Sequence, residues 1–246
     1  MYNKNIILSD FNERLKGRFC MIGKKLFGGM LCITCLLFGT SAALAADEES
    51  VENPAVSQVV AAQSIQGESV ATLNQMRALA WKHNHLAPDL APYYLKMGEK
   101  YGIRGDVAFC QAALETNWWR YDGLVRARQY NYSNLGKLYE KAIPNENING
   151  ANHYCVWYMV GDNGASFATP EDGVEAQFQH LYGALTNDPL PAGFYLKDSG
   201  FNEMERGTAV NWDDLEPIGP CELTEDMSYG ETIVQDFYAE MLQLKK

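Results

Sequence analysis

Glu115 is the residue of this sequence best placed for acid–base chemistry. It ends an apolar run and is the only charged residue between Asp106 and Arg120. Trp118 and Trp119 follow it closely. Burial, the negative end of a helix dipole and an aromatic wall would each raise the pKa of this carboxyl group. A carboxyl group that stays protonated near neutral pH is what a general acid needs to protonate a glycosidic oxygen.

The same spacing also fits a structural carboxylate. Arg104 and Arg120 are both close enough in sequence to pair with Glu115. An ion pair of that kind would lower the pKa of the carboxyl group and leave it without a catalytic role. The residues alone leave both alternatives open.

Two predicted helices bring Glu115 into position. The first begins near residue 88, where apolar residues start to recur at helical spacing. Its apolar stripe consists of Leu90, Tyr94, Met97 and Tyr101. A turn at Gly102 and Gly105 leads to the second helix, for which Asp106 is a suitable N-cap. Because the second helix is apolar nearly all round, we expect it at the centre of the domain.

The rest of the chain alternates between irregular and helical patterns. Residues 117–168 are rich in Gly, Asn and Tyr, which predicts loops with a few short strands. Thr169 and Pro170 have the character of a helix start, and residues 187–220 are irregular again. The predicted closing helix carries Ile233, Phe237, Met241 and Leu244. The prediction is a mainly helical α+β fold with an irregular lobe inserted between its helices.

Composition excludes some classes of protein. The chain has 246 residues, is 47% hydrophobic and carries a formal charge of −11, so it is a globular domain with an appendage rather than a disordered chain. Residues 1–45 contain six basic and two acidic residues; without them 14 basic and 29 acidic residues remain, a charge of −15. A domain with this negative charge repels the phosphate backbone of nucleic acids, so we expect no nucleic acid partner.

Residues 1–45 have the organisation of a signal peptide. Lys24 and Lys25 precede an apolar run, which ends in small residues that predict cleavage after Ala45. Met21 is the expected true start, because residues 1–20 add no signal-peptide character. An uncleaved membrane anchor is the alternative, since about 20 apolar residues can span a bilayer. We expect a secreted, extracellular protein with no stable membrane anchor after cleavage.

Residues 46–71 are acidic, rich in Ser, Gln and Ala, and almost without aromatic residues, which predicts a flexible tether. The catalytic domain is then expected over residues 72–246. Three cysteines remain after cleavage, and they are Cys110, Cys155 and Cys221. Three widely spaced cysteines form neither a disulfide framework nor a metal cluster. One disulfide with one buried thiol stays open, with Cys110 the expected packed thiol.

Several motifs resemble those of a known family. The segment Tyr101-Gly102-Ile103-Arg104-Gly105-Asp106-Val107-Ala108-Phe109, followed by Gln111 and Leu114-Glu115-Thr116, resembles the catalytic helix of bacterial β-N-acetylglucosaminidases of glycoside hydrolase family 73. Further segments are similar in the same order, and they include Trp119-Arg120-Tyr121, Gly164-Ala165-Ser166-Phe167, Gln179-His180-Leu181, Arg206-Gly207 and Tyr229-Gly230. The resemblance covers nearly the whole mature chain, from about Leu73 onward.

The resemblance implies a lysozyme-like α+β fold that cleaves peptidoglycan glycan strands at N-acetylglucosamine, with Glu115 as the catalytic acid. It also implies substrate-binding residues, namely Gln129, Asn131, Asn134, Phe167, Gln177, His180 and Tyr229. For Gln177 and His180 a packing role is equally open. Of Trp118 and Trp119, we expect one to stack on a sugar ring and the other to close the core.

The chain departs from the family pattern in the Asn-rich loop, where it has Tyr130-Asn131-Tyr132-Ser133-Asn134-Leu135-Gly136, and in a longer stretch over residues 137–163. These departures concern substrate length and preference rather than the acid. The second carboxylate is not identified; the candidates are Asp122, Glu140 and Glu146. Its separation from Glu115 would decide between retaining and inverting chemistry, and a substrate-assisted route needs no nucleophile.

We expect a monomer associated with the cell wall, with peptidoglycan glycan strands as its partner and no cofactor. No metal site is predicted: His83 and His85 lie near the tether, and His153 and His180 lack clustered partners. Two rival functions stay open. One is a lytic transglycosylase on the same fold, and the other is a non-catalytic protein that binds cell-wall glycans.

Overall fold

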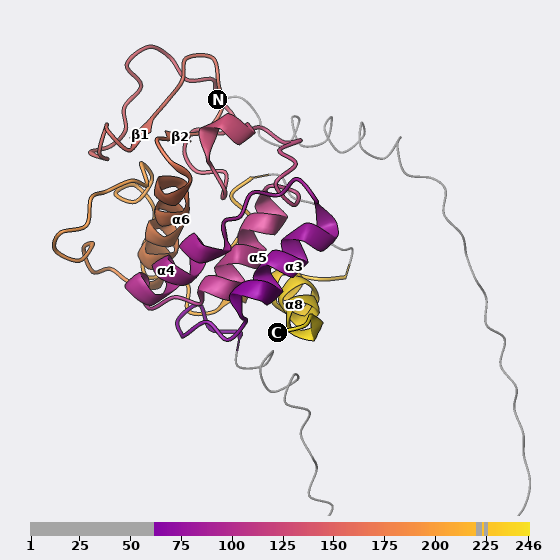
Figure 1. Cartoon of the computed structure of the whole chain (residues 1–246). Helices are drawn as coiled ribbons and strands as arrows, with labels where there is room; N and C mark the ends of the chain where they lie inside the picture. The colour runs from indigo at the N-terminus through magenta and orange to yellow at the C-terminus, as the bar shows by residue number, and fades with distance from the viewer. Residues whose placement is uncertain (1–61, 220–222, 224–225) are drawn as a thin grey trace, which may run out of the picture. The chain divides into compact units, whose positions relative to one another are not determined.

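The computed structural model describes residues 62–219, 223 and 226–246. Figure 1 shows a group of helices with a lobe of loops at one end. The helices before the lobe are α3 (Leu73–His83), α4 (Ala91–Tyr101) and α5 (Gly105–Glu115). Those after it are α6 (Pro170–Leu185) and, at the C-terminus, the consecutive segments α7 (Tyr229–Glu231), η3 (Thr232–Tyr238) and α8 (Ala239–Gln243).

The lobe between α5 and α6 holds the one sheet of the described residues. Strands β1 (Val156–Trp157) and β2 (Ser166–Phe167) pair antiparallel, with Val156 opposite Phe167. A short 3₁₀ turn, η1 (Ala127–Gln129), precedes them, and another, η2 (Trp212–Asp214), lies in the irregular segment after α6. This arrangement confirms the predicted mainly helical α+β fold with an irregular lobe inserted between helices.

Helix α5 is the centre of the domain, as its composition predicts. All eleven of its residues are buried, and it packs against α4, η3 and α3. Figure 1 shows it lying between α3 and α4. A helix that is apolar all round is stable only when neighbours cover every face. The polar residue at its C-terminal end, Glu115, is therefore carried into the interior with the rest of the helix.

The helices predicted from near residue 88 and from Pro170 are both present, as α4 and α6; α6 begins at the predicted residue, whereas α4 begins later than predicted, at Ala91. Helix α4 begins at Ala91 and ends at Tyr101, and its C-cap, Gly102, adopts a left-handed conformation with φ of 66°. Helix α6 starts at Pro170, and the Thr169 hydroxyl accepts a hydrogen bond from the amide of Asp172. The predicted C-terminal helix is also present, with a π-helical stretch in its middle.

Asp106 does not cap α5 as predicted. The cap position falls on Arg104, and Asp106 lies inside the first turn. Its carboxylate instead accepts hydrogen bonds from the amides of Val70 and Ala71, at 2.7 and 3.0 Å, and from the Arg104 side chain. Partners from a distant segment thus compete successfully with the local cap.

Helix α3 was not among the predicted elements. Its start nevertheless has a recognisable signal, a capping box in which the Thr72 hydroxyl and the Gln75 side chain bond each other's backbone amides. The side-chain amide of Gln75 also donates to the backbone carbonyls of Leu242 and Leu244, at 3.2 and 3.1 Å. These bonds tie the start of α3 to the end of the chain.

The last ten residues of the predicted tether are packed on the domain. Ala62, Ile65 and Ala71 are buried, and Ile65 exchanges backbone hydrogen bonds with Val210 and Arg104. Residues 62–71, which were predicted to belong to the tether, therefore contribute contacts to the domain that was expected to begin at residue 72. The rest of the tether, 46–61, and the predicted signal peptide, 1–45, lie outside the described residues.

Two of the three cysteines fall within the described residues, and neither forms a disulfide there. Cys110 is buried in α5, the environment predicted for a packed thiol, and Cys155 is half-buried. Cys221 lies outside the described residues. No helix in the described part of the chain is long and apolar enough to cross a membrane.

Candidate functional site

The site is built around the carboxyl group of Glu115. It occupies the last position of α5, and only 5% of the residue is exposed. Because α5 is the central helix, its C-terminal end lies beneath the inserted lobe and is covered by it. Three segments that are far apart in sequence meet there, namely the Asn-rich loop, the segment before residue 220 and the start of α7.

Each oxygen of Glu115 accepts two hydrogen bonds. Oε1 accepts from the Tyr229 hydroxyl at 2.6 Å and from the amide of Ile218 at 3.3 Å. Oε2 accepts from the side-chain amide of Asn134 at 2.7 Å and from the amide of Gly219 at 3.4 Å. All four donors are neutral. Glu115 is therefore held by hydrogen bonds rather than by the arginine pairing considered above.

The two arginines that were alternative partners are engaged elsewhere. Arg104 pairs with Asp106 at 3.1 Å, and Arg120 donates to the backbone carbonyls of His83 and Asn117. Burial raises the pKa of Glu115, while the hydrogen bonds from Tyr229, Asn134 and the two amides lower it. Burial prevails, so the pKa lies above the ordinary value for a glutamate.

A chain of buried side-chain hydrogen bonds extends from Glu115 into the helices. The Tyr229 hydroxyl accepts from Gln111 at 3.1 Å, and the Gln111 side-chain oxygen accepts from Gln177 at 2.7 Å. Gln177 in turn accepts from the Tyr94 hydroxyl at 2.5 Å. This chain joins α4, α5, α6 and α7. It fixes the Tyr229 hydroxyl, and so the orientation of the Glu115 carboxyl group.

A pocket of about 390 Å³ lies near this carboxyl group, although Glu115 itself is not among the residues that line it. Ile218, whose amide donates to Glu115, forms part of its wall. The pocket lies between the inserted lobe, α6 and the loop after α6. Its polar lining residues are Lys137, Glu146, Asn147, Asn149, Tyr158, His180, Asp198, Ser199 and Glu203. Amides, hydroxyls and charged groups around one cavity are suited to a polar ligand such as a sugar.

The pocket contains one of the three candidate second carboxylates. Glu146 lines it and pairs with Lys137 at 2.7 Å, and this contact holds the pKa of Glu146 below its ordinary value. Asp122 is exposed and accepts a hydrogen bond from Asn117. Glu140 is exposed as well. Neither of them lines the pocket.

Of the predicted substrate-binding residues, the structure brings Asn134 and Tyr229 onto Glu115, and places His180 on the pocket. Gln177 reaches the site only through Gln111. Asn134 has a left-handed backbone, with φ of 55°, a conformation that Asn tolerates better than most residues.

Other predicted binding residues hold the lobe together. Gln129 donates to the carbonyl of Asn163 at 2.8 Å, and Asn131 donates to those of Leu135 and Ala165 at 2.9 and 3.0 Å. Phe167 is buried in a small apolar cluster of the lobe. These three residues are buried and support the loop that carries Asn134, rather than lining the pocket.

Both tryptophans lie in the core. Trp118 is stacked between His83 and Phe237, with ring centroids 3.7 and 4.4 Å away, and Trp119 packs on Phe109. Both are more than nine-tenths buried. Neither offers an open ring face to a sugar in this structure, whereas one of the two was predicted to do so.

Sequence reasoning missed four contributors to the site. Gln111 was noted only as a motif residue, Asp198 was not noted, and the amides of Ile218 and Gly219 lie in a segment with no helical or strand pattern. The residue type of Gln111 was the available signal, because a polar residue on an otherwise apolar buried helix needs a partner.

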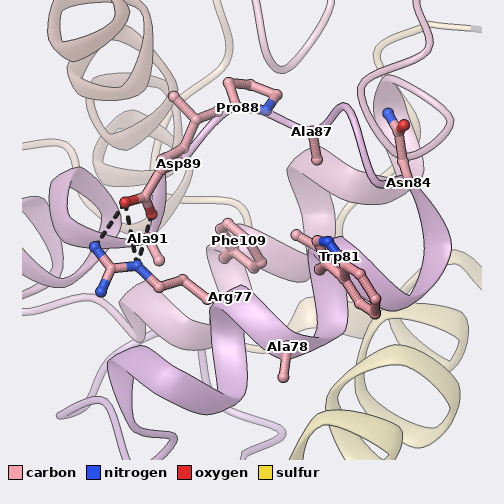
Figure 2. A pocket seen from close by; sticks show the side chains of 11 residues that line it. Arg77, Ala78, Trp81, Asn84, Ala87, Pro88, Asp89, Ala91 and Phe109 are labelled. Atoms are coloured by element: carbon pink, nitrogen blue, oxygen red, sulfur yellow. Dashed lines mark hydrogen bonds and ion pairs between the residues drawn. The ribbon is translucent and has the colours of Figure 1, made fainter.

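A second hollow, of about 420 Å³, lies away from this chemistry (Figure 2). It is bordered by α3, the start of α4 and Phe109, and most of its lining is apolar. Figure 2 shows the exposed ion pair of Arg77 and Asp89 at one side and Trp81 at the other. None of the candidate site residues lines it. No group of metal-binding side chains occurs among the described residues.

Comparison with known proteins agrees with the geometry. The chain matches the glucosaminidase family, described as mannosyl-glycoprotein endo-beta-N-acetylglucosaminidase, over residues 91–239, more than half of its length. No curated protein and no solved structure gives a match. The matched range runs from the start of α4 to the start of α8, so it includes Glu115, its four donors and the adjoining pocket. The chain belongs to the glucosaminidase family and is a glycoside hydrolase, an endo-β-N-acetylglucosaminidase with a lysozyme-like α+β fold.

Proposed function

We propose that the protein is a secreted hydrolase of peptidoglycan, that it cleaves glycan strands at N-acetylglucosamine, and that Glu115 is its general acid. The observation that carries this proposal is the position of Glu115. It is a buried carboxyl group with a raised pKa, beside a polar pocket, at the end of the central helix. A general acid must hold its proton until the glycosidic oxygen arrives.

The hydrogen bonds of Glu115 support this role for a specific reason. Three of its four donors are N–H groups, which can only donate. The fourth is the Tyr229 hydroxyl, whose oxygen can also accept. When Glu115 is protonated, Tyr229 can accept that proton in a hydrogen bond, and the bound substrate then replaces Tyr229 as the acceptor.

Glu146 is the carboxylate that we propose acts with Glu115. It is the one candidate that lines the pocket, and its bond to Lys137 keeps it ionised. An ionised carboxylate stabilises the positive charge that develops on the sugar ring in the transition state. The opposed pKa shifts of Glu115 and Glu146 fit one group that gives a proton and one that remains charged.

The proposed substrate indicates where the protein acts. We propose that the protein is exported by residues 1–45, loses them, and works as a monomer at the cell wall. With a charge of −15 after cleavage, it gains nothing from general attraction to anionic wall polymers. Recognition would then depend on the polar groups that line the pocket.

The test is mass analysis of purified peptidoglycan digested by the protein, with Glu115→Gln as the matched control. The proposal predicts new reducing ends at N-acetylglucosamine with the native chain only. Anhydro-sugar products would indicate a lytic transglycosylase instead. Binding to insoluble peptidoglycan with no products, even at high protein concentration, would indicate a binding protein.

A further inference from the structure

His180 and Asp198 form a fixed pair on the wall of the pocket. Nδ1 of His180, on α6, lies 3.0 Å from Oδ2 of Asp198, in the loop after α6. Asp198 is 1% exposed, and its other oxygen accepts from the amide of Gly200 at 2.8 Å. Both oxygens of this buried carboxylate therefore have donors, and the carboxylate is held in one orientation.

The loop that carries Asp198 is clamped onto α6 from two directions. The side-chain oxygen of Gln179 accepts from the amides of Lys197 and Asp198, at 2.7 and 3.1 Å. The Lys197 ammonium pairs with Asp172, at 2.7 Å, and with Glu175, both on α6. The position of Asp198 against His180 is thus built into the fold rather than left to a mobile surface chain.

The histidine has one polar atom left for a ligand. Since Nδ1 donates its hydrogen to Asp198, Nε2 is the remaining nitrogen of a ring that lines the pocket. In the neutral ring Nε2 carries only a lone pair and accepts, whereas in the protonated ring it donates. The charge of His180 therefore decides which substrate groups it can bind.

The surrounding charges favour the protonated ring. Burial lowers the pKa of His180, but the hydrogen bond and charge of Asp198, with the charge of Glu115, outweigh it and leave the pKa raised. The other charged groups that line the pocket are Lys137, Glu146 and Glu203. Lys137 is neutralised by its pairing with Glu146. On the α6 side, Asp172 and Glu175 are paired with Lys197, so no unbalanced cation opposes a charged His180.

We propose that Asp198 is a positioning residue that holds His180 as an imidazolium, so that Nε2–H donates to a carbonyl or hydroxyl oxygen of the sugar bound beside Glu115. The acetamido carbonyl of an N-acetylated sugar is the strongest neutral acceptor of that class. This inference rests on the proposed function for the identity of the ligand. It adds a residue, Asp198, and a required charge state to the site.

The experiment measures the affinity of soluble peptidoglycan glycan strands by calorimetry between pH 5 and pH 8.5, in the Glu115→Gln background. That background removes turnover and the titration of Glu115, so binding is tested whether or not the native chain proves to be a hydrolase. Three further substitutions are compared in it, Asp198→Asn, His180→Gln and, as a matched control, His83→Gln. His83 also pairs with a carboxylate, Glu240, but lies away from the pocket.

We expect affinity to fall about tenfold as pH rises through the pKa of His180, the effect of losing one hydrogen bond from a charged donor. Asp198→Asn should move this fall to lower pH, because the hydrogen bond and charge of Asp198 raise the pKa of His180, and leave affinity at the lowest pH nearly unchanged. His180→Gln should lower affinity at pH 5 and abolish the pH dependence. His83→Gln should behave as the background does.

Two results would overturn this inference alone. One is binding that does not vary with pH in the background protein. The other is an Asp198→Asn variant that binds equally weakly at every pH, as a purely structural role predicts. Absence of any glycan binding would overturn this inference and the choice of ligand together, whereas normal pH-dependent binding without hydrolysis by the native chain would overturn the proposed function alone.

Discussion

The hydroxyl of Tyr229 donates to Oε1 of Glu115 over 2.6 Å, across 114 residues of sequence. It is the shortest of the four hydrogen bonds to that carboxyl group, and the hydroxyl is itself held by Gln111. The C-terminal segment of the chain thus completes the environment of a residue on the central helix. The pKa of Glu115 is set by opposition between its burial and these donors.

Removing this hydroxyl is the first prediction. In Tyr229→Phe, Glu115 loses a bond that favours its ionised form, so its pKa rises further and the alkaline limb of the kcat profile moves to higher pH. The proton is also given up less readily and the carboxyl group is less well oriented, so kcat falls by about 10- to 100-fold. Steady-state rates of reducing-end release across pH would measure both effects.

The control for that substitution is Tyr182→Phe, which removes the hydroxyl of a half-buried tyrosine that donates to the Pro189 carbonyl at 3.5 Å and does not line the pocket. Its pH profile should match that of the native chain. An unchanged alkaline limb in Tyr229→Phe would show that the hydroxyl does not act on the acid.

Gly219 offers a second way to disturb the acid without touching its side chain. A Cβ atom at this position would overlap the side-chain amide of Asn134, the other partner of Oε2. Gly219→Ala should therefore displace one or both donors, lower kcat about tenfold and raise the pKa of Glu115. The matched control is Gly123→Ala, because nothing lies within 4 Å of a Cβ atom there. Equal activity of the two variants would contradict this prediction.

Stability should respond to Glu115 in the direction that its pKa requires. A carboxyl group whose pKa is raised by folding weakens the folded state at pH values above its unfolded pKa, because ionising it there costs free energy. At pH 7, Glu115→Gln should therefore melt at the same temperature as the native chain or at a higher one. A gain of about 1 kcal/mol in the free energy of unfolding would raise the melting temperature by a few degrees. The difference should vanish below about pH 4, where the glutamate is protonated in both states. Calorimetric melting at both pH values tests this, and a variant less stable only at pH 7 would oppose it.

The sequence predicted the parts of the fold and site that depend on local composition. The burial of α5 follows from its apolar residues, and the start of α6 follows from Thr169 and Pro170. Glu115 was found because it is the one charged residue after Asp106 in this apolar helix, at its C-terminal end. Asn134 and Tyr229 were found through resemblance, since their meeting with Glu115 depends on the path of the chain over 19 and 114 residues.

The remainder depended on tertiary partners that no local pattern encodes. Asp106 is a good cap by type, but the amides of Val70 and Ala71 bind it instead, and they belong to a segment whose composition suggested a tether. Asp198 lies in an irregular loop, and only the packing of that loop on α6 brings it to His180. Tryptophan is a residue type that can stack on sugar rings, but Trp118 instead stacks on His83 and Phe237 and lies in the core.

The central claim is that Glu115 supplies the proton to the glycosidic oxygen. The most direct test compares the rate of reducing-end release from purified peptidoglycan by the native chain and by Glu115→Gln, with near-UV circular dichroism as the check on folding. We predict a loss of at least about 10³-fold with an unchanged spectrum. A correctly folded variant that keeps a tenth or more of the native rate would contradict it.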